Sequence, residues 1–76
     1  MNIENLVKMA NQIGRFFESE PDQVQAVTDV AKHIQRFWDP RMRAALARHI
    51  DSGGAGLLAI VVQACRQSGL AAAGKH

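Results

Sequence analysis

The sequence of 76 residues has a single cysteine, two prolines, little net charge and no long apolar run. Cys65 cannot form an internal disulfide, which is typical of a protein from a reducing compartment. The longest apolar run, AGLLAIVV, is far shorter than the roughly 20 residues that a membrane-spanning helix needs. The first ten residues mix acidic and basic side chains, so they do not look like a signal peptide. We therefore expect a soluble, cytoplasmic chain with no membrane partner.

Features that would indicate a reaction centre or a nucleic-acid site are also scarce. The formal charge of +2 leaves little long-range electric field, which argues against a nucleic-acid binder. His33, His49 and His76 have no cysteine at metal-binding spacing, and Cys65 has no neighbouring base, which favours a small buried residue over a nucleophile. The GGAG segment at 53–56 lacks the Lys-Ser/Thr of a phosphate loop. We predict no catalytic, cofactor-binding or metal-binding residues and no bound cofactor.

The chain is long enough for one domain, residues 1–76. A chain of this size buries only about 60% of its unfolded surface, so a partner would add useful stability. Apolar residues recur at steps of three and four, which is typical of amphipathic helices, and no strand finds a partner strand. The predicted fold is all-α, a small bundle or orthogonal array, with a flexible tail at 69–76 and helices at about 3–18, 21–37, 40–51 and 55–68.

Local signals support these helices. Asn2 can cap the first helix, and Ser19, Pro21 and Asp22 together resemble the start of the second. Gly14 inside the first helix is either a tolerated defect of about 1 kcal/mol or a place where another helix crosses closely. The apolar faces of the first two helices are predicted to consist of Ile3, Leu6, Val7, Ala10, Ile13, Phe16 and Phe17, and of Val24, Val27, Val30, Ala31, Ile34 and Phe37.

The segment RFWDPRMRAALARHI, residues 36–50, contains the only tryptophan and an Asp-Pro step. Asp39 and Pro40 are predicted to end the second helix and begin the third, with Asp39 as the cap and Pro40 in the first turn. Burying Trp38 is worth roughly 4–6 kcal/mol, which favours the core. A place in an interface remains the alternative for Trp38.

Four arginines in the same segment lack an explanation in helix formation. Arg41 and Arg48 are seven residues apart and share a helix face, whereas Arg43 lies about 160° from Arg41. They do not form the single stripe that a helix in a nucleic-acid groove would present. A solvated face explains each of them, and so does recruitment to an acidic protein surface. The candidate partner interface is therefore Trp38, Arg41, Arg43 and Arg48.

Two long segments resemble a known family when taken together. LVKMANQIGRFFESEPD, followed by VAKHIQRFWDPRMRAALARHI, a glycine-rich break and a short apolar helix, resembles the delta subunit family of NAD-dependent formate dehydrogenases. The resemblance covers about residues 6–65, and its most specific parts are MANQIG at 9–14 and FWDPRMR at 37–43. The family often has a proline in the last helix, where this chain has Ala59 or a neighbour. The exact bounds of that helix are therefore open.

The resemblance implies a non-catalytic subunit of a cytoplasmic molybdenum or tungsten enzyme. In that family a large alpha subunit oxidises formate at a pterin site, and electrons pass through iron–sulfur clusters to flavin and NAD in the beta and gamma subunits. The delta subunit would carry no cofactor and would assist assembly or stability of the complex, including insertion of the pterin cofactor. Two alternatives stay open on the residues alone: a nucleic-acid-binding or regulatory helical module, and a self-associating helical bundle.

Overall fold

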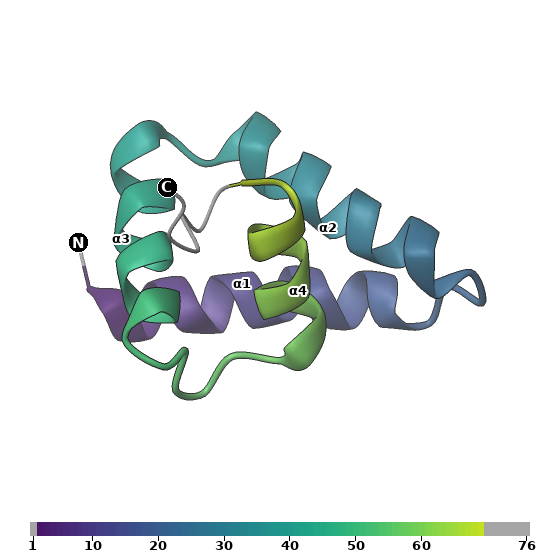
Figure 1. The fold of residues 1–76 in the computed structure, drawn as a ribbon, viewed down its shortest axis with the longest axis horizontal. Coiled ribbons are helices and arrows are strands. Elements are labelled where there is room, and N and C mark those ends of the chain that lie inside the picture. The colour runs from purple at the N-terminus through teal and green to yellow at the C-terminus, as the bar shows by residue number, and fades with distance from the viewer. Residues whose placement is uncertain (1, 70–76) are drawn as a thin grey trace.

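The computed structural model describes residues 2–69, which form four α-helices and no strand. In Figure 1, α1 and α2 run antiparallel, α3 stands across one end of the pair, and α4 crosses in front of α1. The all-α prediction is therefore confirmed. Apart from Gly69, the tail predicted at 69–76 lies outside the described residues. No helix within them is long and apolar enough to cross a membrane. The helices are α1 (Ile3–Glu18), α2 (Gln23–Phe37), α3 (Pro40–Asp51) and α4 (Ala59–Gln67).

The first and third helices have the predicted bounds because their caps are local. The Asn2 side chain accepts a hydrogen bond from the Glu4 backbone N–H at 2.8 Å. Asp39 accepts one from the Met42 backbone N–H at 2.9 Å, and Pro40 is the first residue of α3. Each cap satisfies one of the N–H groups that a helix start leaves unpaired. The predicted turn at Asp39 and Pro40 is confirmed.

The second and fourth helices are shorter than predicted. α2 begins at Gln23 because Asp22 is its cap and accepts from the Gln25 backbone N–H at 3.2 Å. Ser19 instead ends α1, so Pro21 lies in the turn between the helices. α4 begins only at Ala59, and the chain before it contains glycines with positive φ, a conformation that is left-handed and rarely adopted by other residues. These are Gly53, Gly54 and Gly56, with φ of 121°, 66° and 82°.

A single apolar core joins the four helices. Every buried side chain of the described residues is apolar, and Val30, Ile34, Leu46, Val61 and Ala64 are fully inaccessible. α4 packs on α1 and α2, whereas α3 packs on α1. The predicted place of Trp38 in the core is confirmed, with 5% of its surface exposed. The other core residues are Leu6, Ala10, Ala26, Val27, Ile50, Ile60 and Cys65.

Gly14 marks a close crossing of two helices. A β-carbon on Gly14 would lie 2.9 Å from Val61 Cγ2 and 3.1 Å from Ile60 Cγ2, both on α4. A contact of 2.9 Å is essentially never seen at a real β-carbon and 3.1 Å is unusually tight, so a larger residue here would force the α4 side chains to shift. Of the two readings of this glycine, the close approach of another helix is the correct one.

Asn11, one turn before Gly14, holds the start of α4. Its Nδ2 donates to the Gly56 carbonyl at 2.9 Å, and its Oδ1 accepts from the Leu58 backbone N–H at 2.9 Å. No side chain of the α4 segment itself caps that helix. The MANQIG motif therefore supplies both an anchor for the chain just before α4, through Asn11, and the space for α4, through Gly14.

Candidate interaction surface

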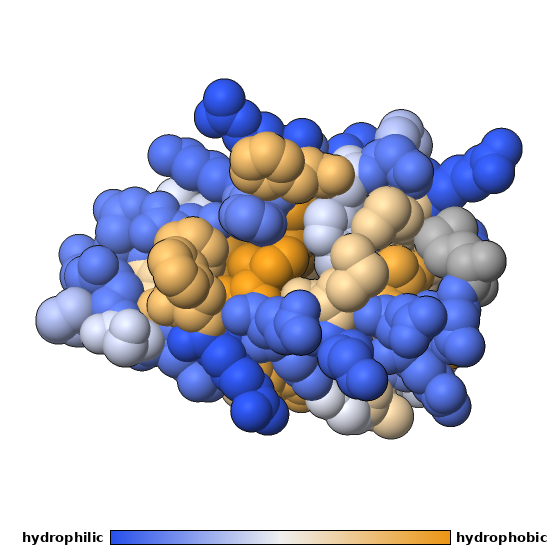
Figure 2. Space-filling view, turned by 180° about the vertical axis from the view of Figure 1, so that it is seen from behind, coloured by the Kyte–Doolittle hydropathy of each residue, from blue (hydrophilic) through white to orange (hydrophobic). Residues whose placement is uncertain are grey.

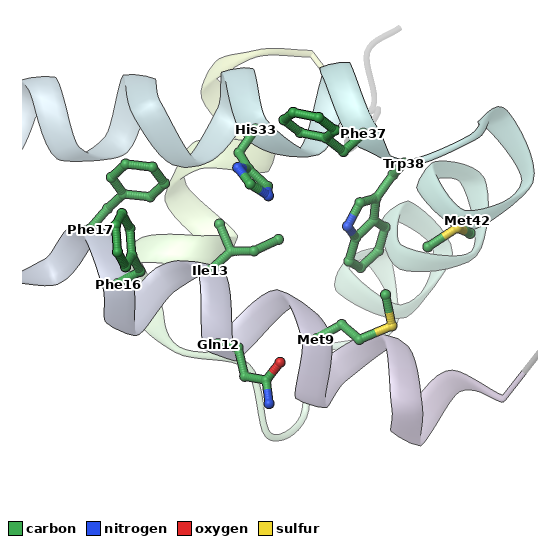
Figure 3. Close-up of a pocket in the computed structure, with 9 residues that line it drawn as sticks. All are labelled: Met9, Gln12, Ile13, Phe16, Phe17, His33, Phe37, Trp38 and Met42. Atoms are coloured by element: carbon green, nitrogen blue, oxygen red, sulfur yellow. The ribbon is translucent and has the colours of Figure 1, made fainter.

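An apolar groove of about 510 Å³ lies between α1 and α2, beside the start of α3. In Figure 2, which shows the molecule from behind the view of Figure 1, apolar side chains gather along the middle of this face. Figure 3 shows the lining side chains: Ile13, Phe17, His33 and Trp38 lie between α1 and α2, whereas Gln12 points away from them. The lining consists of Met9, Gln12, Ile13, Phe16, Phe17, His33, Phe37, Trp38 and Met42.

Large apolar side chains on the edges of the groove are open to solvent. Phe16 is 75% exposed, Phe37 is 67% exposed and Met9 is 40% exposed. Ile13 and Met42 are half-buried and lie deeper, packed against the core. An exposed apolar surface of this kind on a small helical domain is typical of a binding site.

Adjacent aromatic residues explain why the groove exists. Phe16 and Phe17 lie 100° apart on α1, so only Phe17 packs against the core and Phe16 points outward. α2 ends at Phe37, and the extended backbone of Trp38 (φ −92°, ψ 138°) carries the indole inward while the phenyl ring stays outside.

The predicted apolar faces need correction at Phe16, at Phe37 and at Val24, which is 73% exposed. The signal that identifies the two phenylalanines was present in the sequence. Two neighbouring large aromatics cannot both face one helical partner, and this pattern occurs at FF and at FW.

An aromatic row runs along the groove. The Phe16 and Phe17 rings meet edge to face with centroids 5.0 Å apart, and the His33 ring lies 6.2 Å from Phe17 and 4.7 Å from Phe37. Edge-to-face and offset arrangements are the ones that aromatic pairs prefer, and each adds modestly to the stability of the packing. The imidazole of His33 thus links the two helices that form the walls.

The predicted interface residues are not in one place. Trp38 lies in the core and lines the groove. Arg41, three residues later and one before Met42, is exposed. Arg43 instead binds the end of α2: its Nη1 donates to the Trp38 carbonyl at 2.6 Å and to the Gln35 carbonyl at 3.1 Å. The prediction that these arginines contact a partner remains a prediction, and the structure adds an internal role for Arg43.

Arg48 is exposed at the other end of α3. It lines a separate shallow hollow together with Ile3 and His49. A fourth arginine, Arg36, has its guanidinium carbon 5.9 Å from the centre of the Phe37 ring, at the edge of the groove. Arg36 and Arg41, but not Arg48, are therefore the exposed arginines of the α2–α3 corner.

Reactive groups are sparse in the described part of the chain. Cys65 is 1% exposed, and burial raises the pKa of its thiol from 9.0 to about 11. The thiol is therefore protonated at neutral pH, and a thiol in that form is a poor nucleophile. Among residues 2–69, no three His, Cys, Asp or Glu side chains are placed to hold a metal ion.

Comparison with known proteins gives one match. A family model described as NADH-dependent formate dehydrogenase delta subunit FdsD matches residues 5–65. That range includes the MANQIG and FWDPRMR motifs and every residue that lines the groove. No curated protein and no solved structure matches the chain.

Proposed function

Because the chain belongs to the family of NADH-dependent formate dehydrogenase delta subunits, we propose that it is a non-catalytic subunit of such an enzyme. It assists the assembly or stability of the complex by docking onto the other subunits. The large catalytic subunit is its main partner. The complex is a cytoplasmic molybdenum or tungsten enzyme, and the chain acts while the pterin cofactor is inserted.

The observation that carries this proposal is the open apolar groove between α1 and α2. Phe16, Phe37 and Met9 expose apolar surface that a free monomer would gain stability by covering. Aromatic side chains and methionine are enriched at protein–protein interfaces. An apolar groove with exposed aromatic edges is better suited to binding a protein than to turning over a small polar substrate such as formate.

A pull-down from the native cell tests the docking. The tagged chain should recover the large catalytic subunit in stoichiometric amount. If the tagged chain is recovered without any other formate dehydrogenase subunit, the proposal is wrong.

Deletion of the gene tests the assisting role. We expect lower formate-dependent reduction of NAD and a lower metal or pterin content in the purified enzyme. A deletion strain whose complex keeps its full subunit composition, metal content and activity would contradict an assembly or stabilising function.

A further inference from the structure

α1 is covered by α4 on one side and left open on the other. Gly14 faces α4, whereas Met9 and Phe16 lie about 140° and 160° around the helix from it. These two residues line the groove together with Phe37 of α2. The groove is therefore the position that a further helix would take on the uncovered side of the α1–α2 pair.

The chemistry of the lining favours a helix over an extended peptide. Apart from the indole N–H of Trp38, only Gln12 and His33 contribute polar side-chain groups to the lining. The described residues offer no sheet edge with which an extended peptide could pair. The backbone N–H and C=O groups of an extended peptide would lose water without gaining hydrogen-bond partners. A helix satisfies these groups with its own internal hydrogen bonds.

The length of the groove sets the length of the helix that can lie in it, which we call the occupant. Its α1 wall runs from Met9 to Phe17, which is about 12 Å at 1.5 Å per residue, or roughly two helical turns. A helix of that length presents apolar side chains at positions i, i+3 or i+4, and i+7 to such a surface. Met9 and Met42 have flexible thioether side chains that adapt to the shape of the side chain they receive.

Two exposed arginines, Arg36 and Arg41, lie at the α2–α3 corner, next in sequence to the groove-lining residues Phe37 and Met42. Arg36 lies against the Phe37 ring, and Arg41 is exposed immediately before Met42. The acidic residue between them, Asp39, accepts the capping hydrogen bond of α3. An acidic side chain on the occupant is therefore favoured at this corner.

A second copy of the chain is a poor occupant. Outside the groove, the only large apolar side chains exposed by the described residues are Ile3 and Val24. They lie on different helices and do not form an apolar helical stripe of two turns. We therefore take the occupant from another protein, and pairing of two copies through their grooves is an outcome that crosslinking would detect.

Resting on the proposed function, we infer that the groove binds an amphipathic helix of another subunit of the enzyme. That helix is about two turns long at the contact. It has apolar side chains at i, i+3 or i+4, and i+7, and an acidic residue at the end that meets Arg36 and Arg41.

Site-specific crosslinking in the native cell tests this assignment. The photoreactive amino acid p-benzoylphenylalanine is placed at Phe16 or Phe37, and, as a control, at Gln63, which is exposed on α4. Both groove positions should crosslink to one segment of another subunit with the stated spacing and acidic end. The Gln63 position should not crosslink to that segment.

Three crosslinking results would overturn the inference. They are products with a second copy of this chain, products with a segment that lacks the apolar spacing, and no product from either groove position in an intact complex. The proposed function fails separately, when the unsubstituted chain recovers no other subunit.

A charge reversal tests the acidic end of the helix. The double variant Arg36→Glu, Arg41→Glu should recover about tenfold less of the partner subunit, and the remaining recovery should depend less on salt. Lys32→Glu is the matched control, because Lys32 is exposed on α2 beside the end of α4 rather than at the groove. Equal recovery by the double variant and the control would show that no acidic group meets the corner.

Discussion

The Leu58 backbone N–H donates a hydrogen bond to the Asn11 side chain at 2.9 Å, although 47 positions separate the two residues in the chain. The Nδ2 of the same Asn11 side chain donates to the Gly56 carbonyl at 2.9 Å. A single side chain of α1 therefore holds both the loop at Gly56 and the backbone N–H of Leu58, the residue immediately before α4. This relationship explains why an asparagine stands in the middle of α1, where its intrinsic helix propensity is low.

Asn11→Ala should lower the free energy of unfolding by about 1–3 kcal/mol, because both hydrogen bonds are lost and the Leu58 N–H is part-buried. Asn11→Asp keeps the oxygen that accepts from the Leu58 N–H and should lose less stability than Asn11→Ala. Asn5→Ala, at an exposed position of the same helix, is the control and should change stability by less than about 0.5 kcal/mol. Urea unfolding followed by circular dichroism measures all three. Equal effects at positions 11 and 5 would contradict the anchoring role.

Gly14→Ala should destabilise the fold by about 1–3 kcal/mol, although alanine is the better helix former. The new methyl group would meet Val61 Cγ2 at 2.9 Å, and valine is stiff about its first side-chain torsion. In a protein that already carries Val61→Ala, Gly14→Ala should cost less stability than it does in the parent. The coupling energy from this double-mutant cycle measures the contact between the two positions. A Gly14→Ala variant that melts at or above the parent temperature would show that α4 can move away.

Arg43→Met should lower the free energy of unfolding by about 1–2 kcal/mol, because the Trp38 and Gln35 carbonyls lose a charged donor while the apolar stem is kept. Arg41→Met is the matched control and should be nearly neutral for stability, since Arg41 is exposed. Thermal unfolding of the two variants separates the roles. If the two variants have the same melting temperature, the hydrogen bonds of Arg43 make no measurable contribution to stability.

Cys65 should make stability depend on alkaline pH. Its folded pKa of about 11 lies above the ordinary value of 9.0, so the folded state holds the proton where the unfolded state has released it. The contribution of the thiol to stability is complete below about pH 9. It falls as pH rises toward 11, by on the order of 2 kcal/mol. The difference in unfolding free energy between the parent and Cys65→Ala isolates this effect from other groups. A constant difference from pH 8 to pH 11 would be inconsistent with burial of the thiol.

Phe37 and Trp38 are sequence neighbours whose substitutions should have different consequences. Phe37→Ala removes a ring that is 67% exposed and should change stability by less than about 1 kcal/mol while reducing recovery of the partner subunit. Trp38→Ala removes a buried ring and should lose about 3–5 kcal/mol. Melting curves and pull-down yields for the two variants test this separation. Similar stability losses would place Phe37 in the core.

The parts of the fold that could be predicted from the sequence are those decided within a few residues. Asn2, Asp39 and Pro40 act on the adjacent helical turn, so the bounds of α1 and α3 follow from local rules. The predicted start of α2, at residue 21, was wrong because Ser19 and Asp22 are both good caps. Which of the two caps the helix depends on where α1 ends. The start of α4 depends on Asn11, which is distant in sequence.

The candidate site was harder to predict because exposure is decided by packing between helices. Periodicity places Phe16 and Phe37 on apolar faces, but it does not say how wide a face the neighbouring helix covers. Arg43 was predicted to contact a partner, and its carbonyl acceptors come together only when the α2–α3 corner has formed. The groove therefore became visible only with the tertiary structure, although the adjacent aromatics indicated it.

The dependence of α4 on α1 has a consequence for the order of folding. α4 has nine residues, and isolated helices this short are marginal in water. The anchor of the chain just before it and its packing space come from Asn11 and Gly14, which are more than 40 positions away. Contacts between α1 and α2 close much shorter loops and can form sooner. We therefore expect the α1–α2 hairpin to act as a template on which α4 forms as a late event in folding.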